Sequence, residues 1–174
     1  NIAAGLNALG AATSGDDNIA LGRLALGAGV TTGSDNIAIG ATAGDALTSG
    51  GCNIAIGDTA LSAATTTSDN IAIGRSALAV SIDDGACNIA IGMTALGGAD
   101  VSGDNNIAIG SNSADAITSG HSNIAMGVNA LGANTTGTYN VAIGFGAVAT
   151  AGDSGIYDNI GIGRQPDTSA AKVQ

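Results

Sequence analysis

Basic and aromatic residues are scarce in this sequence, and both shortages exclude functions. Four lysines and arginines stand against 14 acidic residues, which gives a net charge of −10. Nucleic-acid binding is disfavoured, because no basic stripe exists to neutralise phosphates. The aromatic residues are Tyr139, Phe145 and Tyr157, too few to make the stacking platforms that bind single strands. We therefore expect no nucleic-acid partner.

Long apolar runs and targeting signals are also missing. No run approaches the roughly 18 apolar residues that a membrane-spanning helix needs, so we expect no membrane span. The sequence has no signal peptide, does not begin with methionine and opens within a repeat. It is therefore expected to be a piece of a longer protein.

Residues for catalysis or metal binding do not assemble into a recognisable set. His121 is the one histidine, and it falls in a predicted turn with no Cys or Glu spaced to share a metal. No Ser-His-Asp or Cys-His set can be built from the sequence. We expect no catalytic residue, no metal site and no cofactor, and we do not expect an enzyme.

A five-residue motif, Asn-Ile-Ala-Ile-Gly or a close variant, occurs ten times along the chain. Its asparagines are Asn1, Asn18, Asn36, Asn53, Asn70, Asn88, Asn106, Asn123, Asn140 and Asn159, in steps of 17 to 19 residues. A fixed short period is typical of a solenoid, in which each repeat buries its apolar side by stacking on its neighbours. The sequence predicts a solenoid of ten coils over residues 1–163 and an exit segment or linker at 164–174.

Alternation of apolar residues predicts that the coils are built from strands. In the third motif Ile37 and Ile39 flank Ala38, so the two isoleucines lie on one side of a strand and the alanine on the other. A glycine then ends the strand, and a second apolar pair such as Ala77-Leu78 predicts a second strand in each coil. The fold class predicted is all-β: a parallel β-solenoid, or β-roll, with coils about 4.8 Å apart.

The asparagine that opens each motif predicts a ladder, in which side-chain amides of successive coils bond to one another as stacked amides do. An alternative is that asparagine is only a turn residue before a strand. The ladder is predicted for Asn36, Asn53, Asn70, Asn88, Asn106, Asn123 and Asn140.

The leucine that follows the second alanine is predicted to fill the interior of the coil. Two coils lack it and carry Gly44 or Ala114 instead, and each then has a large aliphatic residue three positions later, Leu47 or Ile117. Volume lost and regained nearby is what a filled core requires. The same two coils mark a duplication of four coils, residues 18–87 and 88–158, so length is expected to vary as in a spacer or shaft.

The alanine in the middle of the motif is predicted to face outward, away from the isoleucines, and to pack against another copy of the chain. A solvent-facing position has no reason to remain small, whereas a seam between chains has. The alternative is that alanine suits a cramped inner layer of a tightly wound roll. The proposed interchain column is Ala38, Ala55, Ala72, Ala90, Ala108, Ala125 and Ala142.

Two cysteines, Cys52 and Cys87, occupy equivalent positions two coils apart. That spacing places their α-carbons about 9.5 Å apart, beyond the roughly 7 Å that a disulfide spans, so no intrachain bridge is expected. Buried free thiols are the favoured interpretation, and bridges between chains are the alternative.

The motif Asn-Ile-Ala-Ile-Gly-x-x-Ala-Leu, followed by a turn rich in Thr and Gly, resembles the Asn-Ser-Val-Ala-Ile-Gly repeats of YadA-like trimeric adhesin heads. The repeat here is longer than in those heads. Residues 130–144 (ALGANTTGTYNVAIG) are similar to the repeats of bacteriophage tail-fibre shafts, and Asn159 to Pro166 resembles the exit before a chaperone module in such fibres. The resemblance implies a left-handed β-roll, three chains side by side and an extracellular location.

These features favour a structural shaft segment of an extracellular adhesive fibre, with a phage tail fibre as the first hypothesis. Its partners would be further copies of itself in a homotrimer, and a host-surface glycan or protein. Alternatives are a bacterial surface adhesin head and a self-assembling extracellular filament. An ice-binding solenoid is a further hypothesis, but its threonines would have to form a flat array, and here they cluster in turns of different length.

Overall fold

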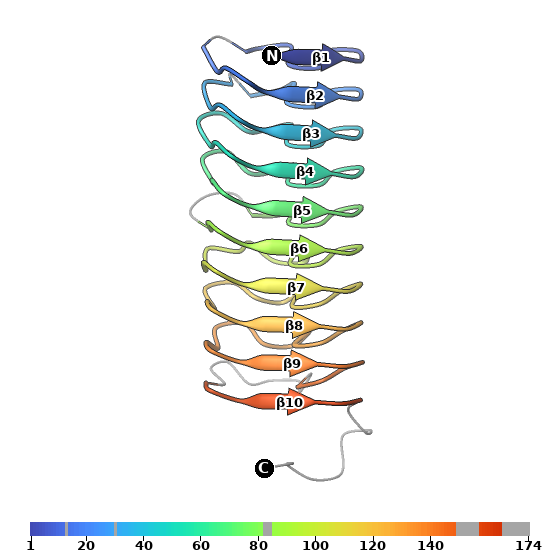
Figure 1. The fold of residues 1–174 in the computed structure, drawn as a ribbon, viewed down its shortest axis with the longest axis vertical. Coiled ribbons are helices and arrows are strands. Elements are labelled where there is room, and N and C mark those ends of the chain that lie inside the picture. The colour runs from blue at the N-terminus through green and yellow to red at the C-terminus, as the bar shows by residue number, and fades with distance from the viewer. Residues whose placement is uncertain (13, 30, 82–84, 149–156, 165–174) are drawn as a thin grey trace.

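The computed structural model describes residues 1–174 except 13, 30, 82–84, 149–156 and 165–174, and its fold is a rod of stacked coils (Figure 1). Each coil contributes one strand of three residues and takes its strand's number below. The strands are β1 (Ile2–Ala4), β2 (Ile19–Leu21), β3 (Ile37–Ile39), β4 (Ile54–Ile56), β5 (Ile71–Ile73), β6 (Ile89–Ile91), β7 (Ile107–Ile109), β8 (Ile124–Met126), β9 (Val141–Ile143) and β10 (Ile160–Ile162). No helix occurs among the described residues, and the predicted exit segment lies outside them from residue 165 onward.

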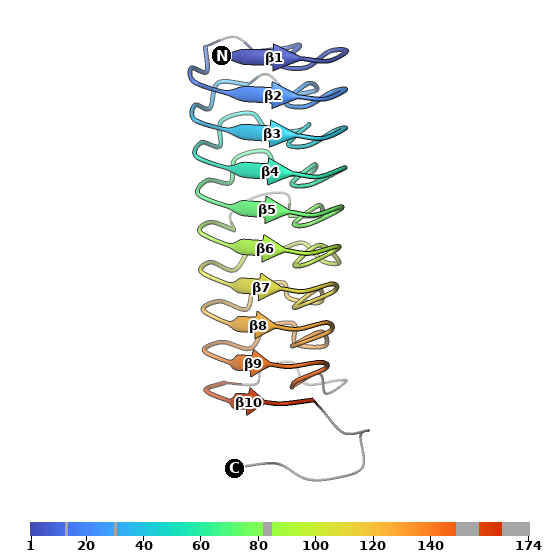
Figure 2. The same cartoon turned by 45° about the vertical axis from the view of Figure 1, so that its right-hand side comes forward.

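The strands form one parallel sheet in which every strand pairs with the next along the chain, from β1 to β10. The pairing is in register, so that equivalent residues are cross-strand partners, as Ala72 of β5 and Ala90 of β6 are. Figures 1 and 2 show the strands as a continuous wall along the rod, with the rest of each coil closing behind it. The all-β parallel solenoid predicted from the repeat is confirmed.

An asparagine ladder runs inside the rod along the start of the strands. The Oδ1 atom of Asn36 accepts hydrogen bonds from both the backbone nitrogen and Nδ2 of Asn53, each at 3.0 Å. Asn53 Nδ2 also donates to the carbonyl oxygen of Thr67 at 2.8 Å, which ties the strand to the last turn of its own coil. The bond from the backbone nitrogen to the Oδ1 atom of the preceding coil recurs along the rod, whereas the bond between side-chain amides is missing at the Asn53–Asn70 and Asn70–Asn88 steps. The asparagines from Asn18 to Asn140 are at most 1% exposed. The amide ladder is therefore present, and the asparagine is more than a turn residue.

The glycine after each strand allows a bend that a side chain would block. Gly74 has a φ of 132°, in a region that L-residues rarely adopt. A Cβ atom there would lie 2.5 Å from the carbonyl oxygen of Gly92 in the next coil. Stacked bends of this shape therefore require glycine in each coil, as the motif has it.

The second apolar segment of each coil is a turn, so the prediction of a second strand is wrong. Leu78 has a φ of 49° and Ser76 a φ of 57°, and both angles lie in the left-handed region rather than the extended one. The turns still bond from coil to coil, since Leu61 N donates to Ala77 O at 2.9 Å. The backbone reverses direction within these few residues, so the segment cannot adopt the extended conformation of a strand.

The two sides of the strand are oriented opposite to the prediction: alanine faces the interior and isoleucine faces outward. Ala72 is fully buried within a single chain, while Ile71 and Ile73 are partly exposed. The interchain role assigned to Ala38, Ala55, Ala72, Ala90, Ala108, Ala125 and Ala142 is therefore wrong, because each is at most 2% exposed before any partner is present.

The physical reason is the thinness of the coil. Leu26 lies across the interior from the strand, close enough that a Cβ on Gly44 would be 3.0 Å from its Cδ2 and 3.8 Å from the Cβ of Ala38. A leucine on one wall leaves room only for a methyl group on the other. The cramped inner layer, the alternative interpretation of the alanine, is the correct one.

The compensation predicted for the missing leucines is confirmed. Leu47 and Ile117 are both fully buried, in the coils where Gly44 and Ala114 replace the usual leucine. They join the leucines of the other coils in one continuous hydrophobic core. The interior is therefore filled along the rod, and the surface that remains available for function is the outer one.

Candidate functional site

The outer side of the sheet is an uninterrupted aliphatic surface, which we call the isoleucine face. Over β2 to β9 its two columns are Ile19, Ile37, Ile54, Ile71, Ile89, Ile107, Ile124 and Val141, and Leu21, Ile39, Ile56, Ile73, Ile91, Ile109, Met126 and Ile143. All sixteen side chains are at least partly exposed, with values of 36% for Ile39 and 37% for Ile143. No polar or charged residue interrupts either column.

Such a surface is costly to leave in water. Soluble single chains rarely expose a continuous apolar patch of this extent, and large patches with polar borders are typical of interaction sites. Fully burying an isoleucine side chain contributes about 1.5–3 kcal/mol, so covering the third that remains on the most exposed of these residues contributes about 0.5–1 kcal/mol, and less on the others. The isoleucine face is therefore a candidate site of association.

Two columns of residues border the isoleucine face, of which the leading one is mostly polar and the trailing one is half apolar. The leading border is formed by the residue before each asparagine: Asp17, Asp35, Cys52, Asp69, Cys87, Asn105, Ser122, Tyr139 and Asp158. All nine have φ between 55° and 62°, the left-handed region, which Asp and Asn tolerate better than most residues. The trailing border is formed by the residue after each glycine: Leu6, Arg23, Ala41, Asp58, Arg75, Met93, Ser111, Val128, Phe145 and Arg164.

The arginines of the trailing border make no ion pair with a carboxylate among the residues that the structure describes. Arg75 Nη2 lies 2.9 Å from the sulfur of Met93 in the next coil. The guanidinium of Arg164 lies 5.4 Å from the centre of the Phe145 ring, a cation–π contact. These contacts hold the side chains of Arg75 and Arg164 on the border, and no ion pair with an acidic residue forms within the described chain.

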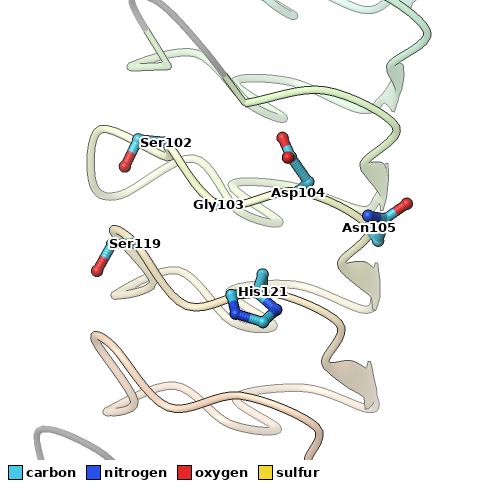
Figure 3. Close-up of a pocket in the computed structure, with 6 residues that line it drawn as sticks. All are labelled: Ser102, Gly103, Asp104, Asn105, Ser119 and His121. Carbon is cyan, nitrogen blue, oxygen red and sulfur yellow. The ribbon is translucent and has the colours of Figure 1, made fainter.

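A shallow polar hollow of about 290 Å³ lies on the turns that lead into β7 and β8 (Figure 3). It is lined by Ser102, Gly103, Asp104, Asn105, Ser119 and His121. Asp104 Oδ1 accepts a hydrogen bond from Ala86 N at 2.8 Å, and Figure 3 shows its carboxylate directed away from His121. The His121 ring meets Tyr139 edge-on at 5.3 Å. The hollow offers hydrogen-bonding groups to a polar ligand, but Asp104 and His121 do not face each other as an acid–base pair would.

Metal and thiol chemistry have little to build on in the described part of the chain. Its His, Cys, Asp and Glu side chains form no group of three that could hold a metal ion. Cys52 and Cys87 are free, as the spacing predicted, but both are exposed, so the prediction of buried thiols is wrong. They stand on the leading border, where eight of the nine residues are exposed. None of the described segments is a helix long and apolar enough to cross a membrane.

Comparison with known proteins gives no family or relative to guide the assignment. No protein-family model, no curated protein and no solved structure matches the chain. The function must therefore be argued from the isoleucine face, its borders and the hollow.

The sequence predicted that the two sides of each strand differ, but it predicted the alanine side to face outward, and the structure has the isoleucine side there. A signal was available, since coils 1 to 9 each pair a Leu, Ile or Val in the turn with the alanine of the strand. Both must be inside for the volumes to match, which leaves the isoleucines outside.

Proposed function

We propose that this chain is a shaft segment of an extracellular adhesive fibre, of the kind found in phage tail fibres, in which copies of the rod pack side by side through the isoleucine face. The observation that carries the proposal is the continuous aliphatic surface on the outer side of β2 to β9. A rod with such a face is suited to holding a binding tip at a distance, because each added coil adds the same contact.

The energetics favour contact along the whole rod. Sixteen side chains, each contributing at most about 0.5–1 kcal/mol when the rest of it is covered, give an upper bound of about 8–16 kcal/mol. Association costs about 4–15 kcal/mol in lost translational and rotational freedom. Covering only a few coils would not offset that cost, so side-by-side packing over most of the length is required.

A homotrimer is the arrangement that the resemblance to YadA-like heads and tail-fibre shafts supports. Three faces turned toward a common axis would remove all three from water. The left-handed coil, the extracellular location and a host-surface partner belong to the same proposal. The hollow lined by Ser102, Asp104 and His121 lies on the turns and reaches the leading border at Asn105, so it offers polar groups to a host glycan or protein at the edge of the packed face.

The experiment is a native mass measurement on the purified protein and on matched lysine variants. The chain has a mass of 16.3 kDa, so the trimer is three times heavier. Ile73→Lys places a charge in the middle of the isoleucine face and is expected to shift the population to monomer. Val80→Lys is the control, because Val80 is 40% exposed and lies in the turn segment of the same coil. The control should keep the native mass.

Four outcomes contradict the proposal or redirect it. A native protein that stays monomeric at high concentration removes the self-association, and so does an Ile73→Lys variant that assembles as the native protein does. Mass that grows without limit as concentration rises favours the self-assembling filament over a closed trimer. Thermal hysteresis of a monomer favours the ice-binding solenoid.

A further inference from the structure

All three arginines of the chain stand in one column, the trailing border of the isoleucine face. They are Arg23 after β2, Arg75 after β5 and Arg164 after β10. A solenoid coil of 17 to 19 residues offers many other exposed positions, and none of them carries an arginine. The trailing border is therefore the place where this acidic chain concentrates its positive charge.

Each of these arginines has an aspartate in the same coil on the opposite border. Asp69 precedes the asparagine of coil 5 and Arg75 follows its glycine, and coils 2 and 10 repeat this arrangement with Asp17 and Asp158. The two borders are separated by the strand. Asp69 and Arg75 stand six positions apart along the chain, with β5 between them. No ion pair joins the two charges of one coil among the residues that the structure describes.

Rotation symmetry decides what each border meets when two isoleucine faces come together. An axis along the rod keeps the copies parallel and level, and it brings the leading border of one copy to the trailing border of the next. Each aspartate is then level with an arginine of the neighbouring copy. A two-fold axis across the rod turns one copy upside down and brings each border against itself, so that no aspartate of the leading border meets an arginine of the trailing border. The charges favour the parallel arrangement.

The register is specified as well as the direction. With coils level, the border contacts include three Asp–Arg pairs and no pair of like charges. A shift of one coil in one direction places Asp35 against Arg23 but Asp69 against Asp58. A shift in the other direction places Asp35 against Asp58 and leaves no arginine opposite an aspartate. A shift of one coil in either direction therefore loses Asp–Arg pairs and brings two aspartates together.

Uncharged coils agree with the same register. Coil 9 has Tyr139 on its leading border and Phe145 on its trailing border, both more than half exposed, so the level arrangement puts ring against ring. In coil 7 the corresponding residues are Asn105 and Ser111, both polar. Apolar contact alone cannot choose among registers here, because the isoleucine columns are nearly the same in every coil.

We propose that copies of this chain associate parallel and with equal coils level, and that Asp–Arg pairs between the borders of neighbouring copies, at coils 2, 5 and 10, set this register. The second copy of the chain is thus the occupant of the isoleucine face. The proposal rests on the self-association proposed above and adds its direction and alignment. It assigns Asp17, Asp69, Asp158 and the three arginines as residues that position the copies.

Disulfide trapping tests the alignment directly. Cys87 and Met93 are the border residues of coil 6, so Met93→Cys in a Cys52→Ser background should cross-link neighbouring copies into covalent dimers and trimers under oxidation. Val128→Cys is the matched control, because Val128 is 41% exposed against 40% for Met93 and stands two coils away on the same border. That offset is about 9.6 Å along the rod, too far for a disulfide. Only M93C should cross-link efficiently.

Charge reversal tests the pairs themselves. Arg75→Asp and Asp69→Arg each replace an attraction by a repulsion and should weaken association by about 5- to 30-fold per interface at low salt. The double variant D69R/R75D restores an opposite-charge pair and should recover most of the affinity. Native mass at a series of concentrations measures all three proteins.

The outcomes separate the two proposals. If Ile73→Lys dissociates the protein but V128C cross-links as well as M93C, the self-association stands and the level register is overturned. The register is also overturned if the protein associates but M93C forms no cross-link and the double reversal recovers nothing. A native monomer overturns both proposals.

Discussion

Asn70 lies in the middle of the asparagine ladder, and its replacement by alanine tests how far that ladder stabilises the rod. Its Nδ2 donates to the carbonyl oxygen of Gly85 at 2.9 Å, which closes its own coil. Its Oδ1 accepts from the backbone nitrogen of Asn88 at 2.9 Å, which joins the next coil. Asn70→Ala removes both bonds. The carbonyl oxygen of Gly85 and the backbone nitrogen of Asn88 then stay buried without a hydrogen-bond partner.

The magnitude follows from those two groups. A buried polar group left without its partner costs about 1–3 kcal/mol, so the variant should lose about 2–6 kcal/mol of unfolding free energy. For a chain of this size that is on the order of 10 °C in melting temperature. Because a solenoid opens locally, the loss should be greatest in coils 5 and 6.

The assay is chemical denaturation at a fixed protein concentration, combined with hydrogen exchange at the Asn88 amide. Fixed concentration is needed because association also stabilises the folded chain. Ser49→Ala is the control, since Ser49 is an exposed turn residue with no side-chain bond in the ladder, and it should change stability by less than about 0.5 kcal/mol. An Asn70→Ala protein as stable as this control, with Asn88 still protected, would refute the structural role of the ladder.

Two further predictions concern the interior and the pH dependence. Ala72→Leu adds volume to the filled core opposite the leucine wall and should cost about 1–3 kcal/mol in denaturation experiments; unchanged stability with an altered native mass would instead place Ala72 at an interface. Desolvation by burial raises the pKa of Asp115 above its ordinary 3.8, so the native state holds this proton more tightly than the unfolded chain. Stability should therefore rise as pH falls from neutral toward 3.8, and Asp115→Asn should flatten that part of the melting-temperature profile and melt higher than the native protein at pH 7. A variant whose profile matches that of the native protein would contradict this role for Asp115.

The repeat made the architecture predictable. A period of 17 to 19 residues with glycine after each apolar triplet leaves stacked strands as the one regular solution, and the asparagine in every coil indicated the ladder. Leu47 and Ile117 could also be assigned to the core. Each stands near a position where the usual leucine is missing, and the regained volume indicates a buried site whatever the conformation of the backbone there. These predictions depend only on residues that are close in sequence or equivalent between coils.

The assignment of inner and outer faces needed the closed coil. Alternation in Ile71, Ala72 and Ile73 shows that two sides differ, but period two is the same whichever side faces inward. The segment around Leu78 was expected to be extended, and its left-handed turn brings the leucine wall so close to the strand that only alanine fits between.

The motif by itself therefore determined a parallel β-solenoid, its asparagine ladder and its filled core. The tertiary structure decided that the isoleucines cover the outside and that Asp69 and Arg75 stand on opposite borders of that surface. The reason is physical: repeat spacing dictates how coils stack, whereas the width of the coil, set by turns that reverse the chain, dictates which side chains it can contain.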